Sequence, residues 1–177
     1  QRMGKSLGNF RTVRDILKQY PGKVVRYSLI SNHYRKPVNF SDEELRMCAK
    51  ALGRLEDAVS NALFAVGIGA GAGSARDEIH RLAASDEAGR ADSESAAERL
   101  DAATAAARTQ FEESMDDDFN TAGAIAALHE LATAINTFVN QDMKRQGQPE
   151  VTEAERSAAA RAVLTMMELG DVVGIIE

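Results

Sequence analysis

The sequence predicts an all-α protein: a helical bundle of about four long helices preceded by a short basic helical arm. Apolar side chains recur at three- and four-residue intervals over most of the chain, and capping boxes stand before several of these runs. No alternating pattern persists long enough to build a sheet. With 177 residues, of which 44% are hydrophobic, the chain is long enough to bury a core of its own.

Two short helices are expected within residues 11–40. Thr12 is placed to cap the first, with Asp15 three residues later, and Pro21-Gly22 ends it. The stretch KVVRYSLISNHY carries a shorter apolar stripe. The residue before Pro37 avoids the α region, so an extended connection follows this second helix.

The most regular pattern begins at Ser41, which forms a capping box with Glu44 and predicts a helix to about Val66. Cys48 falls on its apolar face and is interpreted as a small core residue rather than a nucleophile. As the sole cysteine, it excludes an internal disulfide. The apolar face comprises Leu45, Cys48, Leu52, Leu55, Val59, Ala62, Leu63 and Val66.

Residues 67–94 interrupt this pattern. GIGAGAGS is typical of a flexible linker, and its G-x-G pattern follows no strand, which excludes a dinucleotide-binding turn. Ile79 and Leu82 are the large apolar residues available for packing. We therefore expect a Gly/Ala-rich insertion at about 67–94, with a weak helix followed by a disordered stretch.

Three further long helices follow. Ser95 and Thr152 begin capping boxes before the first and the last, and the middle helix carries an apolar stripe over residues 125–139. The run Asp116-Asp117-Asp118 suggests a Mg²⁺ ligand set or acids that favour the start of the next helix, and the second interpretation is preferred.

Charge is distributed unevenly along the chain. Residues 1–40 hold nine Lys and Arg against one acid, whereas residues 41–177 hold twelve bases and twenty-six acids. A basic arm on an acidic scaffold is typical of a surface that faces a polyanion, although a solvated basic helix face has the same composition. Within the arm, His33-Tyr34-Arg35 suits contact with an RNA backbone, unless Tyr34 instead packs into the bundle.

The chain opens with QRMGKSLGNF, in which Gly4-Lys5-Ser6 matches the end of a P-loop. A P-loop helix begins at the lysine, but Leu7-Gly8-Asn9 breaks a helix and the first cap is Thr12. The sequence therefore favours a mobile loop in which Lys5 brings a point charge to a triphosphate.

RMGKSLGNF resembles KMSKSLGN, the signature loop of class I aminoacyl-tRNA synthetases. The stretches VVRYSLISNHYRKPVNFSDEEL, ALGRLEDAVSNAL and MDDDFNTAGAIAALHELATAIN resemble the cysteinyl-tRNA synthetase family from that loop into its DALR helical bundle. The resemblance covers the chain from Arg2 to about Ile176 apart from the insertion. It implies a signature loop at 1–10, a basic arm at 11–40 and a DALR-type bundle at 41–177.

This family activates cysteine with ATP to form cysteinyl-adenylate and transfers the cysteine to tRNA(Cys). Lys5 matches the catalytic lysine at the ATP phosphates, and Met3 and Ser6 match ATP-binding positions. Arg2 and Gly4 depart from the motif, which changes a compact ammonium and removes a hydroxyl. The resemblance implies tRNA contacts at Arg11, Arg14, Lys18, Arg26, Arg35 and Lys36.

The same resemblance implies that a nucleotide-binding Rossmann domain and a zinc site lie upstream of Gln1. ATP with Mg²⁺ is then a substrate of the full enzyme, and zinc belongs to the upstream domain. His33, His80 and His129 lack the spacing of metal ligands, so no metal site is expected in this chain. We expect the fragment alone to be inactive, monomeric and cytoplasmic, with no membrane segment.

Two alternatives remain open. One is a sister enzyme that joins cysteine to a sugar amine in low-molecular-weight thiol synthesis. Such an enzyme needs no tRNA, so the basic arm and the full bundle argue against it. The other is a non-catalytic helical module that docks RNA or protein, in which case the fragment alone should bind its partner specifically.

Overall fold

The computed structural model describes residues 12–38, 40–65, 67–68, 74–84, 95–142 and 151–176. The regular elements in these ranges are helical, which confirms the predicted all-α class. In chain order they are α1 (Val13–Leu17), α2 (Gly22–Ile30), α3 (Asp42–Ala65), α4 (Ser74–Ala83), α5 (Ala96–Asp116), α6 (Thr121–Thr137), the π-helical turn η2 (Phe138–Asp142) and α8 (Glu153–Val172).

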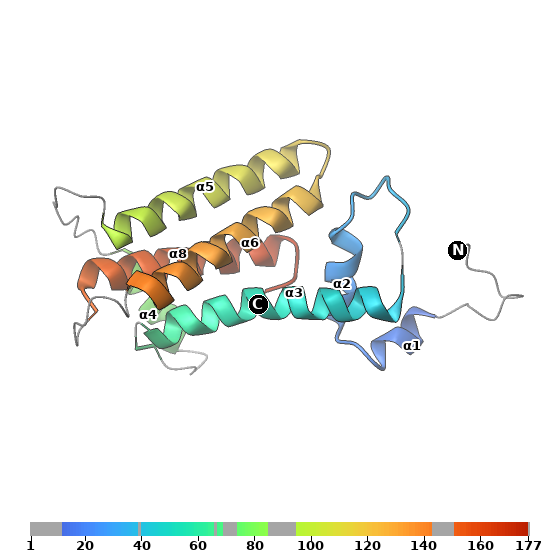
Figure 1. Cartoon of the computed structure of the whole chain (residues 1–177), viewed down its shortest axis with the longest axis horizontal. Coiled ribbons are helices and arrows are strands. Elements are labelled where there is room, and N and C mark those ends of the chain that lie inside the picture. Colours follow the sequence, from blue (N-terminus) through green and yellow to red (C-terminus); the bar gives the residue numbers. More distant parts are fainter. Residues whose placement is uncertain are drawn as a thin grey trace, which may run out of the picture.

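The four long helices α3, α5, α6 and α8 lie alongside one another and enclose the core (Figure 1). Leu55, Leu128 and Met166 are fully buried between them. Helix α6 contacts the other three, and its stretch Thr121–Asn140 has the length and mean hydropathy (1.2) of a membrane span. Half of that stretch is buried against the neighbouring helices, as is usual for the core helix of a bundle.

Side-chain caps fix where the helices begin. Ser95 and Thr152 form complete capping boxes before α5 and α8, as predicted. The hydroxyl of Ser41 accepts the Glu44 amide at the start of α3, and that of Thr12 accepts the Asp15 amide at the start of α1. These local hydrogen bonds explain why the helix starts were readable from sequence.

The interpretation of Asp116–Asp118 as a helix cap was wrong. Asp116 is the last residue of α5, and the side chain of Asn120 caps α6 by accepting the Gly123 amide at 3.1 Å. Asp118 and Phe119 form the connecting turn with φ values of 54° and 52°, in the left-handed region. In this turn the Asp118 carboxylate accepts from Tyr34 and Arg35 and is not the cap of α6.

The insertion contributes to the bundle. Helix α4, which lies wholly within it, contacts α8, and Ile79 is only 2% exposed. The weak helix expected there is therefore present and buries an apolar residue. The disordered stretch expected after it lies largely outside the described residues.

Helices α1 and α2 lie at the end of the molecule where α3 begins (Figure 1). Val24, Val25 and Tyr27 of α2 are buried and belong to the same core as α3. Cys48 is buried on the apolar face of α3 as predicted, and burial raises the pKa of its thiol. The helical part of the arm is thus attached to the bundle by apolar packing.

Candidate nucleic-acid interface

The signature loop lies outside the described residues. Lys5, Met3, Ser6 and Arg11 fall within residues 1–11, so their assignment to ATP and tRNA remains a prediction. The cations that follow them in the chain are described, and their surroundings differ sharply.

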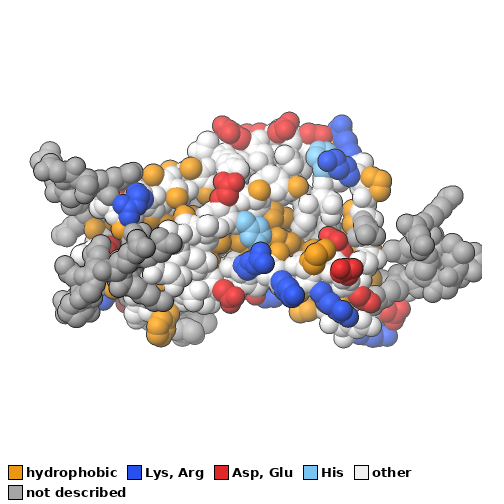
Figure 2. Space-filling model, viewed as in Figure 1, with side chains coloured by type: hydrophobic (Ala, Val, Ile, Leu, Met, Phe, Trp, Pro, Cys, Tyr) orange, Lys and Arg blue, Asp and Glu red, His pale blue; other side chains and the backbone are white. Residues whose placement is uncertain are grey.

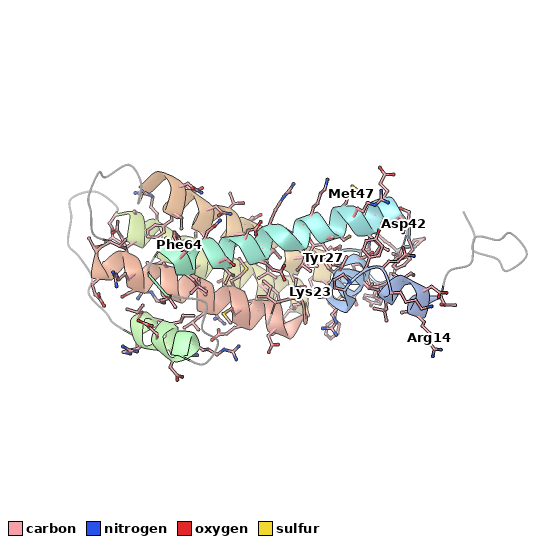
Figure 3. All side chains as sticks on the ribbon, turned by 90° about the horizontal axis from the view of Figure 1, so that it is seen from below. Arg14, Lys23, Tyr27, Asp42, Met47 and Phe64 are labelled. Carbon is pink, nitrogen blue, oxygen red and sulfur yellow. The ribbon has the colours of Figure 1, made fainter. Side chains whose placement is uncertain are left out.

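Helix α1 carries the first two. Lys18 donates a hydrogen bond to Asp15 at 3.1 Å, an exposed ion pair within one turn of chain. Arg14 is exposed and points away from the rest of the molecule (Figure 3). Of this pair, Arg14 is therefore the better placed to meet a ligand.

Helix α2 uses its cations to hold the bundle. Lys23 forms an ion pair with Glu56 of α3. Arg26 donates from Nη1 to the carbonyl oxygen of Gly174 at 2.5 Å, beyond the end of α8. Gly174 has φ +66° and the guanidinium lies directly against it, so a Cβ there would collide with Arg26. Arg26 thus anchors the terminal turn of the bundle.

The turn after α2 forms a polar cluster with Asp118. Tyr34 donates its hydroxyl hydrogen to Asp118 at 2.7 Å, and Arg35 lies 3.0 Å from the same carboxylate. The rings of His33 and Tyr34 stack with centroids 4.9 Å apart. Tyr34 is 59% exposed, so it does not pack into the bundle core. Lys36 is exposed and forms no ion pair with the described part of the chain.

A hydrogen bond between Tyr27 and His129 connects α2 to α6. The Tyr27 hydroxyl lies 2.7 Å from Nε2 of His129, with the two rings edge to face. Burial lowers the pKa of His129, and the nearby Arg54 lowers it further. Burial raises the pKa of Tyr27, so both groups stay neutral near pH 7. Thr121 adds a second link by donating to the carbonyl oxygen of Ile30 at 2.7 Å.

The outer face of α3 carries a basic row that the sequence reasoning did not single out. Arg46, Lys50 and Arg54 are all exposed and follow one another at four-residue spacing. Figure 2 shows a row of Lys and Arg side chains along the α3 side of the face in view, beside a histidine. The signal that could have found it is the i, i+4, i+8 repeat opposite the apolar stripe. We call these three residues the α3 stripe.

The stripe ends at a hollow of about 360 Å³ between α3 and α6. Arg54 and His129 line it together with the polar side chains of Thr133 and Asn136. Within the described ranges, no group of three His, Cys, Asp or Glu residues is placed to hold a metal ion. The chemistry offered on this face is therefore cationic and hydrogen-bonding.

Two family models match the chain. The model for the tRNA synthetases class I (C) catalytic domain matches residues 1–50, and the model for the DALR domain matches residues 110–177. The cysteine–tRNA ligase of Desulfitobacterium hafniense is 40% identical over 98% of this chain and 31% of its own length. That of Heliobacterium modesticaldum is 38% identical over 99% of this chain and 32% of its length.

The cysteine–tRNA ligase of Marinobacter nauticus is 34% identical over 100% of this chain and 29% of its length. The chain therefore spans about a third of the curated relatives it matches. The match to this relative covers the chain from the opening loop to the end of the bundle, in the all-helical fold described above. The chain belongs to the cysteinyl-tRNA synthetase family and corresponds to the part that runs from the signature loop through the DALR bundle.

Proposed function

We propose that this chain supplies the ATP-contacting loop and the tRNA-supporting helices of a cysteine–tRNA ligase. Such an enzyme activates cysteine with ATP to cysteinyl-adenylate and transfers the cysteine to tRNA(Cys). The observation that carries the proposal is the similarity to cysteine–tRNA ligases along the full chain, at 34–40% identity.

Lys5 is the residue assigned to the chemistry. An ammonium at the triphosphate stabilises charge that develops on the phosphate oxygens as the cysteine carboxylate displaces pyrophosphate. Met3 and Ser6 are assigned to positioning ATP beside it. Mg²⁺ accompanies ATP as substrate. We assign the zinc site and the Rossmann domain to the part of the full enzyme that corresponds to the relatives outside the matched segment.

The arm and the bundle are assigned to tRNA. Arg14 and Lys36 are exposed and form no ion pair with the described residues, which supports a direct contact with phosphates. Lys18, Arg26 and Arg35 bind groups of the chain itself, so we assign them a supporting role in placing the arm. We also assign Arg11 to direct phosphate contact, together with Arg14 and Lys36, because it lies with them in the basic arm of the sequence.

The remaining assignments concern the parent enzyme. We propose that it works as a cytoplasmic monomer and that the 177-residue chain alone is inactive. Activation of cysteine requires a nucleotide-binding domain, and the relatives have about two thirds of their length outside the matched segment.

The test is a chimera in which this chain replaces the matching segment of the D. hafniense relative. Cysteine-dependent exchange of pyrophosphate into ATP should occur in the chimera and be absent in the isolated chain. Lys5→Ala should lower the exchange rate by about 100-fold or more, since it removes a charge that acts in the transition state. Lys23→Ala is the matched control, because Lys23 pairs with Glu56 and should leave exchange within about twofold.

Unchanged exchange in the Lys5→Ala chimera would contradict the assigned role of this lysine. A folded chimera that exchanges pyrophosphate with cysteine but never charges tRNA(Cys) would instead contradict the tRNA ligase assignment.

A further inference from the structure

We propose that the α3 stripe, Arg46, Lys50 and Arg54, is a docking surface for the phosphate backbone of tRNA. This inference rests on the proposed function and adds to it a surface on the bundle itself. It also assigns phosphate contact to three cations of α3 that the sequence did not single out, whereas Lys18, Arg26 and Arg35, which the sequence favoured, have a supporting role.

The spacing of the stripe suits a repeating polyanion. An α-helix rises 1.5 Å per residue, so side chains four residues apart start about 6 Å apart along the axis, and the stripe extends over about 12 Å. Successive positions are rotated by only about 40°, which keeps all three on one face. One strand of a duplex carries a charge about every 3.4 Å along its axis, so the roughly 12 Å of the stripe extends over about three phosphates.

The support beneath the stripe is rigid. Helix α3 has 24 residues, and Leu45, Leu52 and Leu55 on its opposite face are at most 1% exposed. Because the helix is fixed by the core, the attachment points of the three side chains are held in line before any ligand arrives. Such preorganisation reduces the entropic cost of binding.

The charges of the stripe are available. Within the described part of the chain, none of its three residues forms an ion pair or a hydrogen bond. Glu43 and Asp57 stand three residues outside its two ends and limit its length to three cations. In an otherwise acidic bundle, an unneutralised basic row favours an anionic partner of the same length scale.

The surroundings favour RNA over an acidic protein. A protein partner gains most of its affinity from large apolar anchors buried at the centre of an interface. Met47, 53% exposed, is one large apolar side chain beside the stripe, and the small Ala51 and the buried Ala132 line the adjoining hollow, so charge rather than an apolar anchor dominates this face. In the adjoining hollow the Asn136 amide nitrogen can donate to a phosphate oxygen, and the Thr133 hydroxyl, which donates to the His129 carbonyl oxygen, can accept from a ribose hydroxyl.

The experiment measures binding of the whole chain to a tRNA(Cys) transcript and to an unrelated RNA hairpin across a range of NaCl concentrations. Three proteins are compared: wild type, R46Q/K50Q/R54Q, and the control R76Q/R81Q/R156Q, which removes the same charge from α4 and α8. Each lost phosphate contact should reduce the slope of log K against log salt by about 0.7 to 0.9. The stripe variant should therefore lose about two to three units of slope and bind about 10- to 100-fold more weakly at 0.1 M salt.

The control should change affinity by less than the stripe variant, with a slope within about half a unit of wild type. Lys50→Glu serves as a second variant, which should weaken binding further than Lys50→Gln while the helical circular dichroism stays native. If the stripe variant keeps the wild-type slope while tRNA(Cys) still binds, the inference is overturned and the proposed function stands. If the wild type binds neither RNA, the inference is overturned, while the proposed function is decided by the chimera. Equal, stripe-dependent binding of both RNAs supports the surface and counts against specificity for tRNA(Cys).

Discussion

The basic arm and the outer face of α3 carry the same kind of charge and use it differently. In the arm, Lys23 and Arg35 pair with carboxylates of the bundle, and Arg26 binds a bundle carbonyl. The α3 stripe forms no ion pair within the described ranges. The difference teaches that formal charge along a sequence overstates what a ligand meets, because an acidic bundle neutralises the cations that pack against it.

The arm contacts have a second consequence. Each one joins the arm to an element far away in sequence, so these cations hold the arm in place together with the buried apolar residues of α2. We call this contact region between the arm and the bundle the seam. Changes at the seam should therefore alter stability, whereas changes in the α3 stripe should alter binding and leave stability unchanged.

Gly174→Ala should give the largest loss. A left-handed residue with a side chain costs about 1–2 kcal/mol, and displacement of the Arg26 guanidinium adds to it, for about 2–3 kcal/mol in the free energy of unfolding. Urea denaturation measures this change. Gly53→Ala, at an open helical position of α3, is the control and should gain about 0.5–1 kcal/mol. Equal effects of the two changes would contradict the tight contact with Arg26.

Ser28→Ala should stabilise the protein. The Ser28 hydroxyl is fully buried and meets no hydrogen-bond partner at normal distance and angle within the described residues; the Cys48 thiol beside it is a weak partner. Removing an unsatisfied buried hydroxyl should raise the free energy of unfolding by about 1 kcal/mol beyond the gain in helix propensity. The exposed Ser60→Ala isolates the propensity contribution. A loss of stability in Ser28→Ala would show that the hydroxyl has a partner.

Asp118→Asn should weaken the cluster at the turn. The amide keeps the shape of the side chain and tolerates the left-handed backbone. The free energy of unfolding should therefore fall by about 0.5–1 kcal/mol, because only the negative charge that interacts with Arg35 and Tyr34 is removed. The difference between variant and wild type should shrink at 1 M NaCl, where exposed charges are screened. Asp57→Asn, which breaks no ion pair within the described part of the chain, should leave stability within about 0.5 kcal/mol at either salt concentration.

The pH dependence of unfolding should show the smallest effect. Because the pKa of His129 is lowered in the folded protein, the unfolded chain takes up its proton first as pH falls below about 6.5. Stability should therefore decline as pH falls through 6.5, and His129→Gln should flatten this decline. The exposed His80→Gln should leave the decline intact; a flat profile in the wild type would contradict the buried, neutral histidine.

Much of the fold could be read from local sequence because local hydrogen bonds set the helix starts. Ser95 and Thr152 cap the helices they precede, and the apolar repeat of α3 marks the face that is buried. The docking of α4 could not be read, since it depends on contacts with α8, a helix far along the chain, against which Ile79, Leu82 and Ala83 pack into the core. The turn at Asp118 was misjudged because its carboxylate serves residues more than 80 positions away.

The site was predictable in kind and less so in detail. The opening loop and the stretches downstream indicated the family, since their residues stand in the family's order along the chain. Which cations face solvent depends on neighbours such as Glu56 and Asp118, which only the folded chain brings close. The α3 stripe was missed because it lies in a segment whose overall charge is acidic.

An equal-charge comparison of two double variants tests most directly whether available cations, rather than formal charge, decide RNA binding. Lys50→Gln with Arg54→Gln removes two unpaired charges, and Lys18→Gln with Arg35→Gln removes two paired ones. For tRNA(Cys), the slope of log K against log salt should fall by about 1.5 in the first variant and by less than about 0.5 in the second. Equal losses in the two variants, or a larger loss in the second, would contradict the distinction between the arm and α3.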